Sequence, residues 1–202
     1  MKKKILVKGP ILSRSGYGEQ TRFAVRSLRS YEKYLDIFII PTTWGKTGWV
    51  WEESEEREWI DERIKATAIY LNQGGQFDMS LQVTIPNEWE KLAPVNIGYT
   101  AGIETTKVAP QWIEKSMIMD KIVVVSNHAK EVYESTSYTA QDKNTGKTVD
   151  NFRCQAPIEV VNYPVRAIGN PDSLDLELET DFNFLVSSQW GPRKNIDNTI
   201  KF

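Results

Sequence analysis

The first 41 residues alternate between apolar runs and turn-forming residues in an order that strongly constrains the fold. Residues 4–9 (KILVKG) form a short apolar run that ends in Gly-Pro, and residues 36–41 (DIFIIP) form a second run. Between them lie a loop rich in Gly and Ser at residues 13–18 and a stretch at residues 19–31 whose apolar positions recur at helical spacing. A strand, a glycine-containing turn, a helix and a strand make a βαβ unit, which predicts an α/β fold with a parallel sheet.

The chain continues in the same alternation up to residue 165. Apolar runs predict further strands at residues 79–85, 95–100, 121–125 and 158–165. A helix is predicted at residues 52–71, a second one from Pro110, and a third after Ser126, which is placed to act as its N-cap. Residues 136–153 are polar with little periodicity, so we expect an exposed insertion there.

The last 37 residues differ in character from the rest. Residues 166–181 hold a glycine, a proline and five acidic residues, which predicts a linker. Residues 182–188 (FNFLVSS) predict a new strand, followed by the start of a helix. Because a strand and half a helix cannot bury their own faces, we expect one complete domain at residues 1–165 and the truncated opening of a second at residues 182–202. The orphan strand should be disordered or dock on another copy of the chain, giving self-association.

Composition excludes several kinds of site. The 202 residues include 25 Lys and Arg against 27 Asp and Glu, and a net charge of −2 gives no general attraction to nucleic acid or anionic membranes. One cysteine, Cys154, and one histidine, His128, exclude an internal disulfide, a cysteine-rich zinc site and a multi-histidine metal centre. No apolar run approaches the ~18 residues of a membrane span, so we expect a globular, cytoplasmic protein.

The loop at residues 13–18 (SRSGYG) is the first candidate for a ligand site. It would present backbone N–H groups at a helix N-terminus, which suits an anion, and Gly16 and Gly18 let the backbone approach a ligand closely. The spacing is neither the Gly-x-Gly-x-x-Gly of dinucleotide-binding loops nor that of a Walker P-loop. The alternative is a turn that needs its glycines only for packing.

Two later segments should open onto the same edge of the sheet, where open parallel sheets bind ligands. In the first, Thr100 and Gly102 precede Glu104, whose carboxylate can orient a hydroxyl or act as a base. The alternative is a surface glutamate near a helix start. In the second, Ser126 and His128 follow a buried strand. His128 can contact phosphate or hydroxyls, or it can simply belong to the helix cap. The chain has no Gly-x-Ser-x-Gly elbow, so hydrolase chemistry is not expected.

Two further clusters suit a sugar and a phosphate. Trp44, Trp49 and Trp51 lie in one loop and can stack on a sugar ring, or they can pack down the loop itself. Arg193 and Lys194 place two cations beside a helix start, an arrangement that suits phosphate, although a solvated pair is the alternative.

Together these residues resemble the retaining glycosyltransferases of family 4, whose GT-B fold consists of two facing Rossmann-like domains. The resemblance spans nearly the whole chain and rests on motifs that occur in the family's order, namely residues 15–18 with Thr21-Arg22, residues 98–104, residues 126–130 after their strand, and residues 184–186 with 193–195. It implies that residues 1–165 form a Rossmann-like, doubly wound parallel sheet, the N-terminal half of a GT-B fold. It also implies transfer of a sugar from a nucleotide-sugar donor to an acceptor hydroxyl, with retained configuration and no required metal or other cofactor. The acceptor could be a sugar, a lipid or a small molecule.

The resemblance also implies roles for individual residues. In this family the first domain mainly holds the acceptor, and its glycine loop approaches the donor's diphosphate. Glu104 occupies the loop where many relatives place a His that contacts the transferred sugar, so it is the candidate catalytic residue. Lys194 matches the family's donor-phosphate lysine, with Arg193 beside it. The implied substrate-binding residues are Ser15, Gly16, Tyr17, Gly18, Thr100, Gly102, Ser126 and His128.

Two functions from different classes therefore remain open. The first is a partial glycosyltransferase, the acceptor half of an enzyme, which alone would be inactive. The second is a stand-alone module that uses the same edge of the sheet to bind a glycan or a nucleotide without catalysis.

Overall fold

The computed structural model describes residues 2–141, 146–165, 169–170, 176–188 and 190–201, with the Arg193 side chain left out. The chain divides into two compact units, Met1–Val165 and Arg166–Phe202. Half of the predicted linker at residues 166–181 lies outside the described residues. Each unit is described by itself below.

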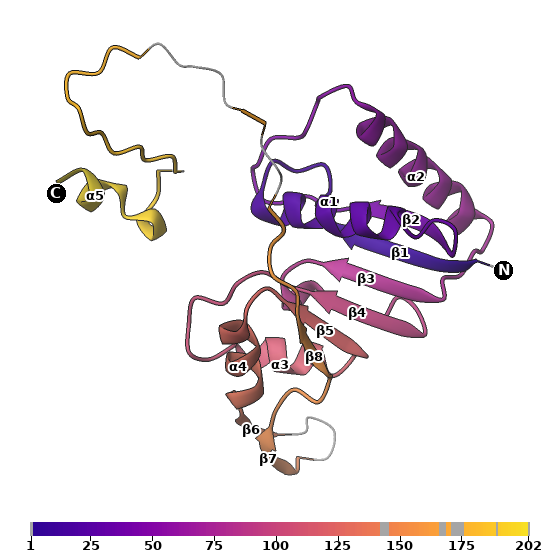
Figure 1. The fold of residues 1–202 in the computed structure, drawn as a ribbon. Helices are drawn as coiled ribbons and strands as arrows, with labels where there is room; N and C mark the ends of the chain where they lie inside the picture. The colour runs from indigo at the N-terminus through magenta and orange to yellow at the C-terminus, as the bar shows by residue number, and fades with distance from the viewer. Residues whose placement is uncertain (1, 142–145, 166–168, 171–175, 189, 202) are drawn as a thin grey trace. The chain divides into compact units, whose positions relative to one another are not determined.

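The first unit is built on one six-stranded parallel sheet with the strand order β2-β1-β3-β4-β5-β8 (Figure 1). Helices flank this sheet, so the predicted α/β class and the Rossmann-like, doubly wound parallel sheet are confirmed. The strands are β1 (Lys3–Gly9), β2 (Leu35–Pro41), β3 (Met79–Val83), β4 (Val95–Tyr99), β5 (Lys121–Val124) and β8 (Ile158–Val160).

The helices of this unit begin where local signals place them. They are α1 (Gly16–Arg29), α2 (Glu55–Asn72), α3 (Pro110–Ser116) and α4 (Asn127–Ser135), with a short 3-10 helix η1 (Pro86–Glu88). The side chains of Ser15, Ser54 and Ser126 cap α1, α2 and α4. The predicted cap at Ser126 is thus confirmed, whereas α1 and α2 begin three residues away from their predicted starts because each serine fixes the first turn.

Two apolar clusters hold the unit together. One joins α1 and α2 to the first two strands, through residues such as Val25, Ile37 and Ile60. The other joins α3 and α4 to β5 and β8 around Trp89 and Tyr133, both of which are fully buried. Trp89 lies against Gly98 of β4, where a β-carbon would come within 2.5 Å of the indole ring. A glycine is therefore needed at this point for the ring to pack on the sheet.

The edge of the sheet at β2 is covered by α2. The Thr67 hydroxyl accepts a hydrogen bond of 2.7 Å from the backbone N–H of Ile39, on the side of β2 that faces no other strand. Covering such an edge removes a template for pairing with other chains.

The exposed insertion predicted at residues 136–153 contains an antiparallel hairpin, β6 (Tyr138–Gln141) and β7 (Thr148–Phe152), most of whose residues are exposed. Two other predictions about the later part of the chain are wrong. The strand predicted at residues 158–165 ends at Val160, since only Ile158–Val160 pair with β5.

Residues 182–188 form no strand, and Phe184 and Leu185 are exposed. A strand needs a neighbour to pair with, and the described part of the second unit contains only η2 (Pro192–Lys194) and α5 (Ile196–Lys201). Self-association through this segment stays a prediction.

Among the residues that the structure describes, no helix is long and apolar enough to cross a membrane.

Candidate functional site

The candidate site lies at the carboxyl ends of the strands, where the order of the sheet changes direction. The chain passes from β1 to β2 on one side and returns to β3 on the other, so the ends of β1 and β3 flank a topological switch point. Open α/β sheets bind ligands in the crevice at such a point. The loop between β1 and α1 begins here.

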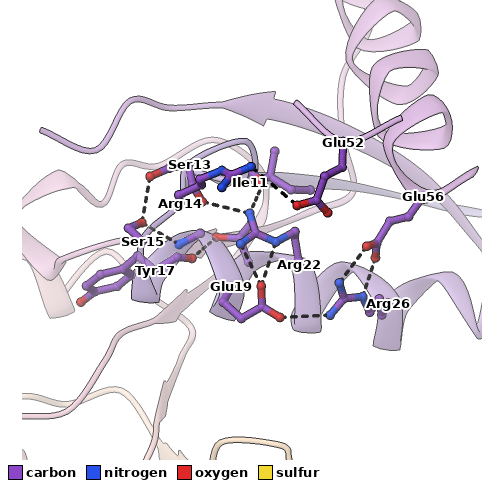
Figure 2. Close-up of polar contacts among 12 residues, drawn as sticks. Ile11, Ser13, Arg14, Ser15, Tyr17, Glu19, Arg22, Arg26, Glu52 and Glu56 are labelled. Carbon is purple, nitrogen blue, oxygen red and sulfur yellow. Dashed lines mark hydrogen bonds and ion pairs between the residues drawn. The ribbon is translucent and has the colours of Figure 1, made fainter. Parts of the chain in front are cut away.

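The loop between β1 and α1 is held in shape by a buried arginine. Arg22 of α1 donates hydrogen bonds to the carbonyl oxygens of Ile11 at 2.6 Å and Ser13 at 3.0 Å (Figure 2). The Nη2 atom of Arg22 also forms an ion pair with the Glu19 carboxylate at 2.8 Å. Because each of these buried carbonyls would otherwise lack a partner, Arg22 fixes the path of the loop. This role was not predicted from the sequence, because Arg22 lies off the apolar stripe of its helix.

The N-terminus of α1 is the part of the loop that suits an anion. The Ser15 hydroxyl accepts the N–H of Gly18 at 3.0 Å, and the Ser15 carbonyl accepts the N–H of Glu19. The amides of Gly16 and Tyr17 also belong to the first turn, whose N–H groups have no partner within a helix. The buried Ser13 lies behind this turn, with its hydroxyl 3.0 Å from that of Ser15 and 2.6 Å from that of Thr47.

The two glycines of the loop have different surroundings. A β-carbon at Gly18 would overlap the carbonyl oxygen of Ser13 and come within 3.0 Å of that of Pro10. A β-carbon at Gly16 would meet nothing within 4 Å. Packing alone therefore accounts for Gly18, whereas the exposed backbone at Gly16 is open to an approaching ligand.

Tyr17 connects this loop to the end of β4. Its hydroxyl lies 2.9 Å from the Thr100 hydroxyl and accepts the N–H of Ala101 at 3.1 Å. Its ring stacks on Trp44 with the centroids 4.3 Å apart. Burial raises the pKa of Tyr17, although the hydrogen bonds with Thr100 and Ala101 oppose the shift, so the phenol is neutral at physiological pH. The structure thus brings two of the predicted site residues, Tyr17 and Thr100, into contact.

Gln20 adds a second link that the sequence did not predict. It is buried, and its side-chain amide donates to the Thr100 carbonyl at 3.2 Å. Its carbonyl oxygen is buried with no hydrogen-bond partner in the described part of the chain. A buried oxygen without a hydrogen-bond partner is uncommon in folded proteins. This one belongs to the residue that joins α1 to the Thr100 carbonyl at the end of β4.

Glu104 and Gly102 lie on the loop that follows β4. Both are exposed, and they line a cleft of about 490 Å³ together with residues of α3 and Tyr138 of the hairpin. The Tyr163 hydroxyl interacts with the backbone of Gly102, and burial raises the pKa of that phenol. The cleft is therefore lined by the Glu104 carboxylate, on the loop that begins at Thr100, and by the aromatic side chains of Trp112 and Tyr138.

The Ser126 and His128 pair is further removed from this network. The Ser126 hydroxyl accepts the N–H of Ala129 at 3.1 Å and so serves as the cap of α4. His128 is exposed on the first turn of that helix, and no hydrogen bond in the described residues joins it to Tyr17 or Thr100. The cap interpretation accounts for Ser126, and a ligand role for His128 stays a prediction.

The predicted donor-phosphate pair belongs to the second unit. Lys194 is exposed at the end of η2, before Asn195, which adopts a left-handed backbone conformation with φ of 52°. The side chain of Arg193 lies outside the described residues.

No group of three or more His, Cys, Asp or Glu side chains in the described residues could hold a metal ion. Comparison with known proteins finds no matching family model, no matching curated protein and no matching solved structure.

Proposed function

We propose that this chain provides the acceptor-side domain of a retaining glycosyltransferase, which transfers a sugar from a nucleotide-sugar donor to an acceptor hydroxyl. The observation that carries the proposal is the contact between Tyr17 and Thr100. It joins the N-terminus of α1, which suits a diphosphate, to the loop that carries Glu104. One edge of the sheet thereby offers an anion site and a carboxylate-lined cleft next to each other.

The proposed roles follow from this arrangement. The amides of Gly16 and Tyr17 approach the donor's diphosphate, favoured by the positive end of the α1 dipole. Glu104 accepts a hydrogen bond from the acceptor hydroxyl and orients its oxygen toward the sugar. The bond between the sugar's anomeric carbon and the diphosphate oxygen then breaks, a bond to the acceptor oxygen forms on the same face, the acceptor's hydroxyl proton passes to the departing phosphate oxygen, and the nucleoside diphosphate leaves. The resemblance to family 4 adds Arg193 and Lys194 as donor-phosphate ligands and requires no metal.

Binding of nucleotide sugars tests the anion site. Isothermal titration of the chain with UDP-glucose, GDP-mannose and pyrophosphate should show binding that Gly16→Ala weakens at least about tenfold, because the added methyl group blocks the approach to the backbone. Gly169→Ala is the matched control, since a β-carbon there also meets nothing within 4 Å. Equal affinity in the Gly16→Ala variant, or no binding of any of the three compounds, would refute the proposal.

Measuring sugar transfer separates the two functions that the sequence analysis left open. A stand-alone module binds a glycan or a nucleotide and transfers no sugar. A transferase domain binds the nucleotide sugar, and in an enzyme that joins it to a donor-side domain, Glu104→Gln lowers the rate of sugar transfer with little change in donor affinity.

A further inference from the structure

The loop that carries three of the tryptophans is fixed against the first-strand loop. The Arg14 N–H donates to the Gly48 carbonyl at 2.8 Å, and the Val50 N–H donates to the Leu12 carbonyl at the same distance. Ser13 and Trp49 form an antiparallel bridge between these two bonds. Such backbone pairing holds residues 48–50 in one conformation beside the candidate anion site.

The tryptophans of this loop divide into one that packs and two that face solvent. Trp44 lies on the ring of Tyr17 and is partly buried. Trp49 and Trp51 are 43% and 73% exposed, and their rings are nearly parallel, at 25°, with centroids 6.2 Å apart. Exposing apolar indole rings to water on a fixed loop is unfavourable in free energy when no ligand covers them. Tryptophan is a poor surface residue but contributes strongly to binding.

The polar groups around the two indoles carry both signs of charge. The Arg14 guanidinium donates to the Trp49 carbonyl at 3.2 Å and lies 3.6 Å from the exposed carboxylate of Glu52. Arg57 lies over the Trp51 ring at 5.9 Å. Hydrogen-bond donors and acceptors therefore border the aromatic faces on the same short stretch of chain.

This combination matches the surface of a pyranose. A pyranose ring has an apolar C–H face, which packs on an aromatic ring, and a rim of hydroxyl groups that both donate and accept hydrogen bonds. Polyanions match it less well, because acidic residues follow the two indoles, with Glu52 and Glu53 at the end of the loop and Glu55, Glu56 and Glu58 in the first turn of α2.

We propose that Trp49 and Trp51, with the Arg14–Glu52 ion pair, form a binding site for an uncharged oligosaccharide, and that this saccharide is the acceptor. The acceptor role rests on the proposed function, whereas the binding site does not. The two indoles and Glu52 lie on the β2–α2 connection, and Arg14 comes from the loop between β1 and α1, so the site adjoins the candidate anion site but uses other residues than Gly16 and Tyr17.

Saturation-transfer NMR and calorimetry with cellotriose, chitotriose and mannotriose test this site on the whole chain. We expect at least one trisaccharide to bind, with transfer to its ring C–H protons, and Trp51→Ala to weaken binding by about tenfold or more. Trp49→Ala should weaken it as well, and Trp51→Phe should retain part of the affinity because it keeps an aromatic face. Trp190→Ala is the matched control, since Trp190 is similarly exposed, at 66%.

Several results would overturn the saccharide site. They are the absence of binding by all three trisaccharides, an unchanged affinity in a Trp49→Ala, Trp51→Ala double variant, and tryptophan-dependent binding to phosphatidylcholine–phosphatidylserine vesicles in place of saccharide. Unaltered circular dichroism and thermal unfolding of each variant establish that the fold is intact.

The outcome is distinguishable from that of the proposed function. If the parent chain binds no nucleotide sugar but binds a saccharide that the tryptophan variants do not bind, the saccharide site stands and the proposed transferase function is refuted. Nucleotide-sugar binding that depends on Gly16, together with no saccharide binding, would refute the site alone.

Discussion

The loops that follow β1 and β4 meet at Tyr17, yet they are built in different ways. In the first loop, Arg22 takes up the carbonyls of Ile11 and Ser13, and backbone fills the space beside Gly18. In the second, Gly102 is exposed, and the nearest atom to a β-carbon there would be a Val125 methyl group at 3.8 Å. The first loop is fixed by packing, and the second is open along a cleft. Gly18 in the first loop is thus a structural requirement, whereas Gly102 in the second leaves room for a ligand.

The largest expected effect comes from filling the space beside Gly18. Gly18→Ala should lower the free energy of unfolding by at least about 3 kcal/mol, because the new methyl group overlaps backbone that cannot move independently. Urea titration followed by circular dichroism measures it. Gly102→Ala is the matched control and should change the stability by less than about 1 kcal/mol. Similar stabilities for the two variants would show that the loops do not differ as described.

Removing the arginine that fixes the first loop should have the next largest effect. Arg22→Met keeps much of the side-chain volume but leaves the carbonyls of Ile11 and Ser13 without partners, at a cost of about 2 kcal/mol. Arg26→Met is the control, because Arg26 makes part-exposed ion pairs with Glu19 and Glu56, and such pairs contribute at most about 1 kcal/mol. An equal loss in both variants would contradict a special role for Arg22.

Tyr17→Phe tests the link between the two loops. The variant loses the hydrogen bonds with Thr100 and Ala101 but keeps the ring on Trp44, so we expect a loss of about 1.5 kcal/mol. Amide hydrogen exchange should accelerate at residues 101–105 and stay slow around Ser13. Acceleration in both loops would show that Tyr17 holds the first loop too.

The same variant has a signature at alkaline pH. Burial raises the pKa of Tyr17 in the folded chain, so above the ordinary tyrosine pKa of 10.0 the unfolded chain releases a proton that the folded chain retains. The unfolded state then binds fewer protons, and the free energy of unfolding falls as the pH rises through this range. Tyr17→Phe removes one such group, so its stability should fall less steeply above pH ~10 than that of the parent chain. An unchanged slope would mean that the phenol is not buried.

Much of the fold could be predicted because its signals are local. The apolar strands, the start of α3 at Pro110 and the cap at Ser126 depend on residues a few positions apart. The hairpin β6–β7 could not be predicted in this way, since its Tyr138 hydroxyl is anchored on the Val108 carbonyl at 2.6 Å, far away in the sequence. Residues 182–188 have the composition of a strand, but pairing with a neighbour decides whether a strand forms.

The site shows the same limit. Tyr17 was a candidate because it lies in the glycine-containing loop after the first predicted strand, and Thr100 because it ends a later predicted strand. The parallel topology brings these two segments to the same edge of the sheet. The roles of Arg22 and Gln20 depend on contacts with Ser13 and Thr100 across the fold, and nothing in their immediate sequence indicates them.

The smallest expected effect on stability comes from removing the serine caps of two helices. Ser15 caps α1 and borders the candidate ligand site, whereas Ser126 caps α4 and does not. Ser15→Ala and Ser126→Ala each remove one hydroxyl from a helix N-terminus, and each should lower the free energy of unfolding by about 1 kcal/mol. Ser15 also contacts the Ser13 hydroxyl beside the open backbone of Gly16, so only Ser15→Ala should weaken binding of UDP-glucose, GDP-mannose or pyrophosphate. Calorimetric titration of both variants measures the difference. Equal affinities would mean that the α1 N-terminus, like that of α4, is capped for stability alone, and the contrast between a ligand-binding and a purely structural helix start would disappear.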